Sequence, residues 1–122
     1  MRLILATVAA AALTAFAANA APPAPTLLHI SSHLAHQARA SLDGAAAVSV
    51  PGYGSTNVPV AAGTHALKIT TSAGATYATP LDLKVAALMR WHGKGYWCVN
   101  LLAHALEVYS TEDCEEEVTD AG

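Results

Sequence analysis

Histidine is the residue type in this sequence whose spacing is best suited to binding chemistry. The chain of 122 residues contains six histidines, and His29, His33 and His36 follow one another at intervals of four and three. On a helix these intervals would place all three imidazoles on one face, and neutral imidazole is a good ligand for Zn(II), Cu(II) or Ni(II). Because His29 belongs to a segment that favours a strand, a metal site here would use His33 and His36. The alternative is that these histidines are solvated or cap local structure.

A second candidate for binding is residues 90–97, where three aromatic side chains surround a sharp bend. Gly93 and Gly95 flank a lysine, so the chain can turn tightly here. An exposed tryptophan and tyrosine beside a lysine and a histidine could stack on a sugar ring or hold a peptide. We therefore predict a binding surface formed by Trp91, His92, Lys94 and Tyr96. The alternative is that the aromatic residues fill the core, as we expect for Trp97, and the exposure of Trp91 decides between the two.

The sequence contains two cysteines, Cys98 and Cys114. An even number of cysteines is typical of a disulfide in an exported chain, and the features of residues 1–20 described below indicate export, so we predict that a disulfide joins the two. It would close a loop of about 15 residues and stabilise the fold by roughly 3 kcal/mol. A metal or redox pair is the alternative, but no C-x-x-C motif is present.

The carboxylates are concentrated at the C-terminus, where residues 112–122 contain six of the nine acidic residues. They lack the alternation of a calcium-binding loop, so we expect an acidic, solvated tail anchored by Cys114. No G-x-S-x-G, H-E-x-x-H or phosphate-binding glycine motif occurs in the sequence. We therefore expect a protein that is not an enzyme and needs no cofactor.

Residues 1–20 have the features of a secretory signal peptide. Arg2 precedes an apolar run, and Ala18-Asn19-Ala20 forms an A-x-A cleavage site. Cleavage would leave 102 residues, enough for one domain, in the periplasm or outside the cell. The net charge of −3 argues against a nucleic-acid partner, and no later segment is apolar enough to span a membrane.

Short segments with β character, separated by turn residues, follow a proline-rich leader at residues 21–26. The clearest are residues 65–70 and 81–85, in which apolar and polar residues alternate. Seven or eight such segments predict an all-β, antiparallel sandwich over residues 27–111. Pro59 places its segment at a sheet edge. We expect residues 32–40 to form a loop with at most one helical turn, and residues 85–90 to form a strand.

The order of these segments resembles a secreted bacterial family known only as a domain of unknown function. The shared pieces are an apolar strand that ends at His29, Gly44 fifteen residues later, the bend at Tyr53-Gly54, and the V-x-A-G-x-[HY] pattern of Val60–His65. The resemblance covers residues 27–75, and residues 31–36 depart from the Ser-Pro-Asp-Ala-Pro loop that is usual in the family. It implies an extracytoplasmic, immunoglobulin-like sandwich, and it brings no known activity and no catalytic residue.

Three functions are therefore open for this chain. The first is an exported, non-enzymatic module that binds or scaffolds a glycan or protein ligand. The second is a small metal-binding protein that uses His33 and His36. The third is a secreted enzyme inhibitor acting through the loop Gly93-Lys94-Gly95.

Overall fold

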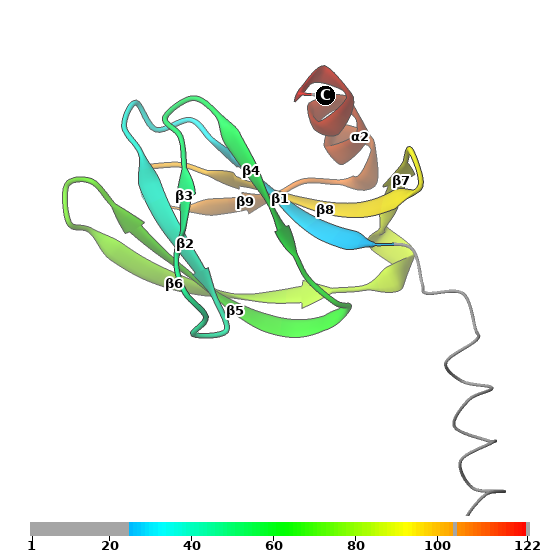
Figure 1. Cartoon of the computed structure of the whole chain (residues 1–122), viewed down its shortest axis with the longest axis horizontal. Coiled ribbons are helices and arrows are strands. Elements are labelled where there is room, and N and C mark those ends of the chain that lie inside the picture. The colour runs from blue at the N-terminus through cyan, green and yellow to red at the C-terminus, as the bar shows by residue number, and fades with distance from the viewer. Residues whose placement is uncertain (1–24, 104, 122) are drawn as a thin grey trace, which may run out of the picture.

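Two β-sheets packed face to face make up most of the structure, a computed structural model that describes residues 25–103 and 105–121 (Figure 1). The predicted all-β sandwich is confirmed. The predicted signal peptide at residues 1–20 and most of the proline-rich leader lie outside the described residues.

The first sheet has the spatial order β4-β1-β8-β7, with β9 also paired to β8. Its strands are β1 (Thr26–Ser32), β4 (Ser55–Pro59), β7 (Met89–Trp91), β8 (Lys94–Leu101) and β9 (Leu106–Val108). The second sheet has the order β3-β2-β5-β6. Its strands are β2 (Ala38–Leu42), β3 (Val48–Val50), β5 (Gly63–Thr71) and β6 (Thr76–Leu83).

Alternation of apolar and polar residues explains which side of each strand faces the core. In β5, Leu67 and Ile69 are each 1% exposed, whereas Lys68 between them faces solvent. Fully burying such a side chain contributes about 1.5–3 kcal/mol. The main core between the sheets is built from residues selected in this way, chiefly Leu28, Ile30, Val50, Leu67, Ile69, Trp97, Val99 and Leu101.

One strand pairing differs from the antiparallel arrangement that we expected. Strands β1 and β8 run parallel, with Leu28 opposite Trp97 and Ile30 opposite Val99, while the other pairings are antiparallel. Strand β4, which contains Pro59, lies at the edge of its sheet as predicted.

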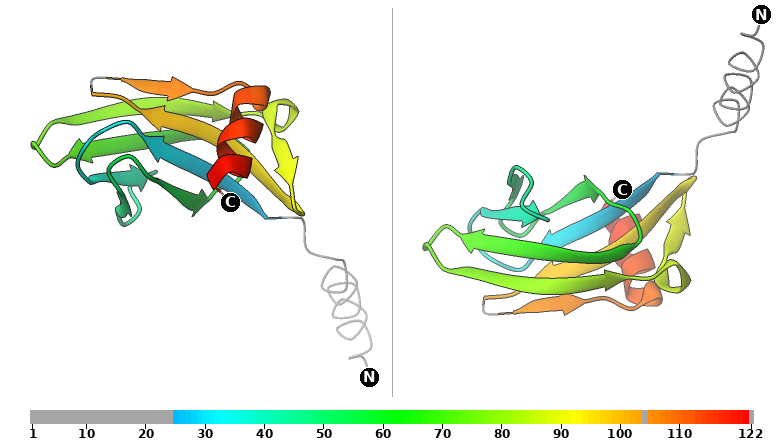
Figure 2. Two further views of the ribbon diagram at one scale, coloured as in Figure 1. Left: turned by 90° about the horizontal axis from the view of Figure 1, so that it is seen from above. Right: turned by 90° about the horizontal axis from the view of Figure 1, so that it is seen from below.

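Strands β1 and β8 are buried on both faces, because helix α2 (Thr111–Ala121) covers the side that faces away from the second sheet. Figure 2 shows this helix lying across β1 and β8 on the outside of the sandwich. The disulfide Cys98–Cys114, with an S–S distance of 2.08 Å, joins the helix to β8 and confirms the predicted pairing.

Residues 112–121 of the expected acidic tail therefore belong to a helix, although most of them are exposed and Cys114 anchors them as predicted. Ser110 caps the helix, because its Oγ accepts a hydrogen bond of 3.1 Å from the N–H of Asp113. Acidic residues in the first turn favour the positive end of the helix dipole. Cys114 and Val118, four residues apart, share the apolar face that packs on Met89 and Tyr96.

Two further segments test the predicted boundaries of the strands. Residues 85–90 do not form one strand, because Val85–Ala87 forms a 3₁₀ turn (η1) and only Met89 to Trp91 continue as β7. Residues 33–37 form a loop without a helix, so the loop prediction is confirmed for these residues, whereas β1 and β2 extend into both ends of the predicted segment. Within the described residues, no helix has both the length and the apolar character needed to span a membrane.

Candidate functional site

A layer of polar side chains lies between helix α2 and the outer face of its sheet. Because side chains alternate along a strand, Leu28 and Ile30 enter the core, while His29 and Ser31 point outwards beneath the helix. His29 is only 2% exposed and Ser31 only 6%. Polar groups buried to this extent are costly unless they find partners, so their contacts are informative.

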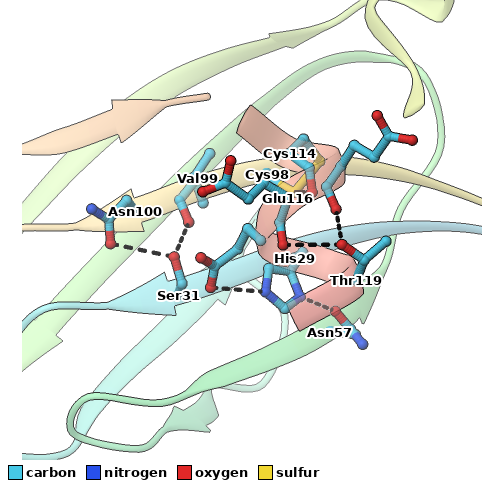
Figure 3. A network of polar contacts seen from close by, with 11 residues as sticks. His29, Ser31, Asn57, Cys98, Val99, Asn100, Cys114, Glu116 and Thr119 are labelled. Carbon is cyan, nitrogen blue, oxygen red and sulfur yellow. Dashed lines mark hydrogen bonds and ion pairs between the residues drawn. A yellow bond between two sulfur atoms is a disulfide. The ribbon is translucent and has the colours of Figure 1, made fainter. Parts of the chain in front are cut away.

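His29 is held between two side chains from different elements (Figure 3). Its Nδ1 lies 2.7 Å from Oδ1 of Asn57 on the neighbouring strand β4, within hydrogen-bond distance. Its Nε2 lies 3.6 Å from Oε1 of Glu117 on α2, which is too far for a hydrogen bond. Among the described residues, this Nε2 is the one buried side-chain polar atom without a hydrogen-bond partner.

The other outward side chains of this layer have partners of their own. The Oγ of Ser31 lies 3.3 Å from Oδ1 of Asn100 and 3.4 Å from the carbonyl oxygen of Val99. Burial raises the pKa of the nearby Tyr109 hydroxyl; a hydrogen bond with Ser31 opposes this shift, and the charge of Glu117 adds to it.

A pocket of about 500 Å³ opens beside this layer, where the end of β1 and the start of β4 meet helix α2. We call it the α2 pocket; its lining residues are Ser31, Ser32, His33, Tyr53, Gly54, Ser55, Glu117 and Asp120. The two carboxylates come from one helix face, at a spacing of three residues. The lining described by the structure contains no lysine or arginine. The pocket is therefore rich in hydrogen-bond acceptors and attractive to cations.

The bend before β4 forms one wall of the α2 pocket. Tyr53 is 74% exposed and adopts a left-handed conformation with φ of 50°. Its N–H donates to the carbonyl oxygen of Leu34 at 2.9 Å, which ties the bend to the loop after β1. Gly52 permits this close approach, because a Cβ atom there would lie 2.3 Å from the carbonyl oxygen of Ala35.

The two histidines predicted to bind metal line different pockets. His33 lines the α2 pocket, whereas His36 lines a separate hollow with Leu34 and Thr71. Nowhere in the described part of the chain do three His, Cys, Asp or Glu side chains form a group that could hold a metal ion.

The predicted aromatic binding surface is divided between the interior and solvent. Tyr96 is 5% exposed and packs beneath α2, and Trp91 is half-buried against the same apolar cluster. The ring of His92 meets Trp91 edge-on, with 4.2 Å between the ring centroids. His92 and Lys94 are exposed, so only these two of the four predicted side chains are fully accessible to a ligand.

The core position predicted for Trp97 is confirmed. It is 6% exposed, and its indole N–H donates to the carbonyl oxygen of Lys84 at 2.9 Å. The predicted inhibitory loop Gly93-Lys94-Gly95 is only partly a loop, because Lys94 and Gly95 already belong to strand β8. The hairpin turn itself consists of His92 and Gly93, which both have positive φ, as a type I′ turn requires.

A second polar cluster, at the other sheet, is a structural brace. Asp43 Oδ2 lies 2.5 Å from Nδ1 of His65, and Asp43 Oδ1 accepts the N–H of Ala66 at 2.8 Å. His65 Nε2 lies 2.7 Å from the carbonyl oxygen of Ala61. The hydrogen bond between the two side chains is the main cause that lowers the pKa of Asp43 and raises that of His65. Since both ring nitrogens are occupied, His65 has no free nitrogen for a ligand.

The sequence alone did not group His29 with Glu117, the carboxylate that faces it, or Glu117 with Asp120 in the α2 pocket. The signal was nevertheless present: Ser110 is a good helix cap, and Cys114 and Val118 have helical spacing. A helix fixed by Cys114 places its carboxylates over the strand that contains Cys98.

Comparison with models of known protein families found no match, and comparison with curated proteins found no relative. The function is therefore argued from the site itself.

Proposed function

We propose that this protein is an exported, non-enzymatic β-sandwich module that binds a cationic ligand in the α2 pocket. The observation that carries this proposal is that two carboxylates, from Glu117 and Asp120, line one pocket, and that Glu117 also faces the buried Nε2 of His29, which has no hydrogen-bond partner. Acceptor groups that converge in a concave site favour a ligand that carries positive charge and hydrogen-bond donors.

Export is supported by two independent features. Residues 1–20 have the pattern of a signal peptide, and the disulfide Cys98–Cys114 is typical of an oxidising compartment. We place the protein in the periplasm or outside the cell. The immunoglobulin-like type of the sandwich is part of the same proposal and rests on the resemblance over residues 27–75.

A binding role is supported by the polar surroundings of His29 and His65. His29 faces an amide and a carboxylate, and His65 faces a carboxylate and a carbonyl oxygen. Neither pairs with a hydroxyl group that it could activate as a nucleophile.

Calorimetric titration of the purified, disulfide-bonded protein tests the proposal. The probes are spermidine, a lysine- and arginine-containing peptide, zinc chloride and a neutral oligosaccharide. We expect at least one of the cations to bind, and the substitution Asp120→Asn to weaken that binding, because it removes a charge from the pocket rim.

Glu112→Gln is the matched control, since Glu112 lies on the same helix but outside the pocket lining. If none of the cations binds, or if Asp120→Asn and Glu112→Gln behave alike, the proposal is wrong.

A further inference from the structure

Beneath helix α2, next to the α2 pocket, the imidazole of His29 and the carboxylate of Glu117 face each other. With Nδ1–H of His29 donated to the amide oxygen of Asn57, the neutral imidazole carries a lone pair on Nε2. That lone pair is buried, has no hydrogen-bond partner, and faces the carboxylate of Glu117 at 3.6 Å. Two acceptors that face each other repel unless a positive charge lies between them.

The distance between these atoms fits two ligands of one metal ion. Zinc bonds to imidazole nitrogen and carboxylate oxygen at about 2.0–2.2 Å, so two ligand atoms at a tetrahedral angle lie about 3.4 Å apart. The observed 3.6 Å is close to this value and well beyond the 2.7–2.9 Å typical of a charge-assisted hydrogen bond.

Asn57 provides independent support for metal binding. Histidines that bind metals generally donate their other ring N–H to an oxygen acceptor, which fixes the tautomer and the orientation of the ring. The amide oxygen of Asn57 occupies this place, 2.7 Å from Nδ1 of His29. The side chain of Glu117 is 34% exposed, which leaves a route by which an ion enters from solvent.

We propose that Nε2 of His29 and Oε1 of Glu117 bind one divalent transition-metal ion, Zn(II) or Cu(II). Imidazole combined with carboxylate suits these ions. The remaining coordination positions would be filled by water, because no third His, Cys, Asp or Glu side chain of the described residues joins this pair in a metal-binding group. This inference rests on the proposed function, since it names the metal ion as the cationic ligand.

Titration of the disulfide-bonded protein with zinc chloride, followed by competition with a chelator, tests this site. We expect one ion per chain and a loss of affinity of about tenfold or more in Glu117→Gln. We also expect a loss of about 10–100-fold in Asn57→Ala, which removes the acceptor that orients the imidazole. Glu117 lies on the partly exposed face of α2, so its variant is expected to fold even if a variant of His29 does not.

Two matched controls define the site. Glu116→Gln removes a neighbouring helix carboxylate that does not line the pocket, and His36→Gln removes the histidine of the separate hollow. Both should bind zinc as the unmodified protein does. Thermal unfolding without metal checks that each variant remains folded.

The ring nitrogens of His29, observed by ¹⁵N NMR, provide a readout that a purely structural role would not change. Zinc bound at Nε2 should shift the Nε2 resonance, while Nδ1 keeps its hydrogen bond to Asn57. A protonated ring that pairs with Glu117 and does not respond to zinc would overturn the inference, as would zinc affinity that is unchanged in Glu117→Gln.

The results separate this inference from the function on which it rests. If spermidine or the basic peptide binds at the pocket and zinc does not, the metal site is wrong while the binding function stands. If neither zinc nor an organic cation binds, both are wrong.

Discussion

At the scale of single residues, the contact between Asp43 and His65 has a defined dependence on pH. The pKa of Asp43 lies below its ordinary value of 3.8, and that of His65 lies above 6.5. The contribution of Asp43 to stability is present above its unfolded pKa and is lost as the pH falls through its lower folded pKa. The contribution of His65 to stability is present below its unfolded pKa and is lost as the pH rises through its higher folded pKa.

We therefore predict that Asp43→Asn reduces stability most between the two ordinary values, near pH 5, where both charges are present. The difference from the unmodified protein should shrink as the pH rises through the raised pKa of His65, because the ring then loses its charge; the second measurement is therefore made in alkaline solution, above that pKa. Because the side chain of Asp43 is about half exposed, solvent screens the ion pair and the effect is modest. Urea unfolding at the two pH values measures it, and a difference that does not change with pH would contradict the predicted ion pair.

At the scale of elements, helix α2 depends on its covalent link to β8. The helix contains six acidic residues and no basic residue, and its apolar contact with the sheet depends largely on Cys114 and Val118. An isolated helix of 11 residues is marginal in water, so packing and the disulfide must hold it in place.

We predict that replacing both cysteines with serine lowers the free energy of unfolding by about 3 kcal/mol, the value expected for a loop of this length. The loss should be accompanied by weaker far-ultraviolet helix signal and by weaker cation binding, because Glu117 and Asp120 are then no longer held over β1. Circular dichroism and urea unfolding measure both effects. If the helix signal and cation binding are retained, the prediction is wrong, because the contacts with the sheet are then sufficient to hold α2 in place without the disulfide.

How far the elements could be predicted depends on how local their signals are. Alternation alone identified β5 and the last three residues of β6, because Leu67 and Ile69, like Leu81 and Leu83, are buried residues two positions apart. The strand predicted at residues 81–85 missed the start of β6 and ran past its end. The helix was missed because its acidic composition outweighed the weaker signals of Ser110, Cys114 and Val118. The turn at Val85–Ala87 was missed because a short apolar run does not reveal its own period.

At the scale of the whole molecule, the candidate site results from long-range packing that a sequence pattern does not contain. His29 meets Asn57 across 28 positions, and it meets Glu117 only because the disulfide fixes α2 above β1. The histidine spacing drew attention to the correct segment, but the strand directs His29 under the helix and the loop separates His33 from His36. The parallel pairing of β1 with β8, which brings His29 beside Cys98, was likewise not foreseen.

The measurement that tests this account most directly is a map of backbone amide shifts in ¹⁵N-labelled protein on addition of zinc chloride. The account predicts that the largest changes lie around His29 on β1, around Asn57 on β4, and from Glu117 to Asp120 on α2. Changes centred instead on His36 and the adjacent residues 71–75, or on the hairpin at residues 91–95, would contradict it, as would a spectrum that zinc leaves unchanged.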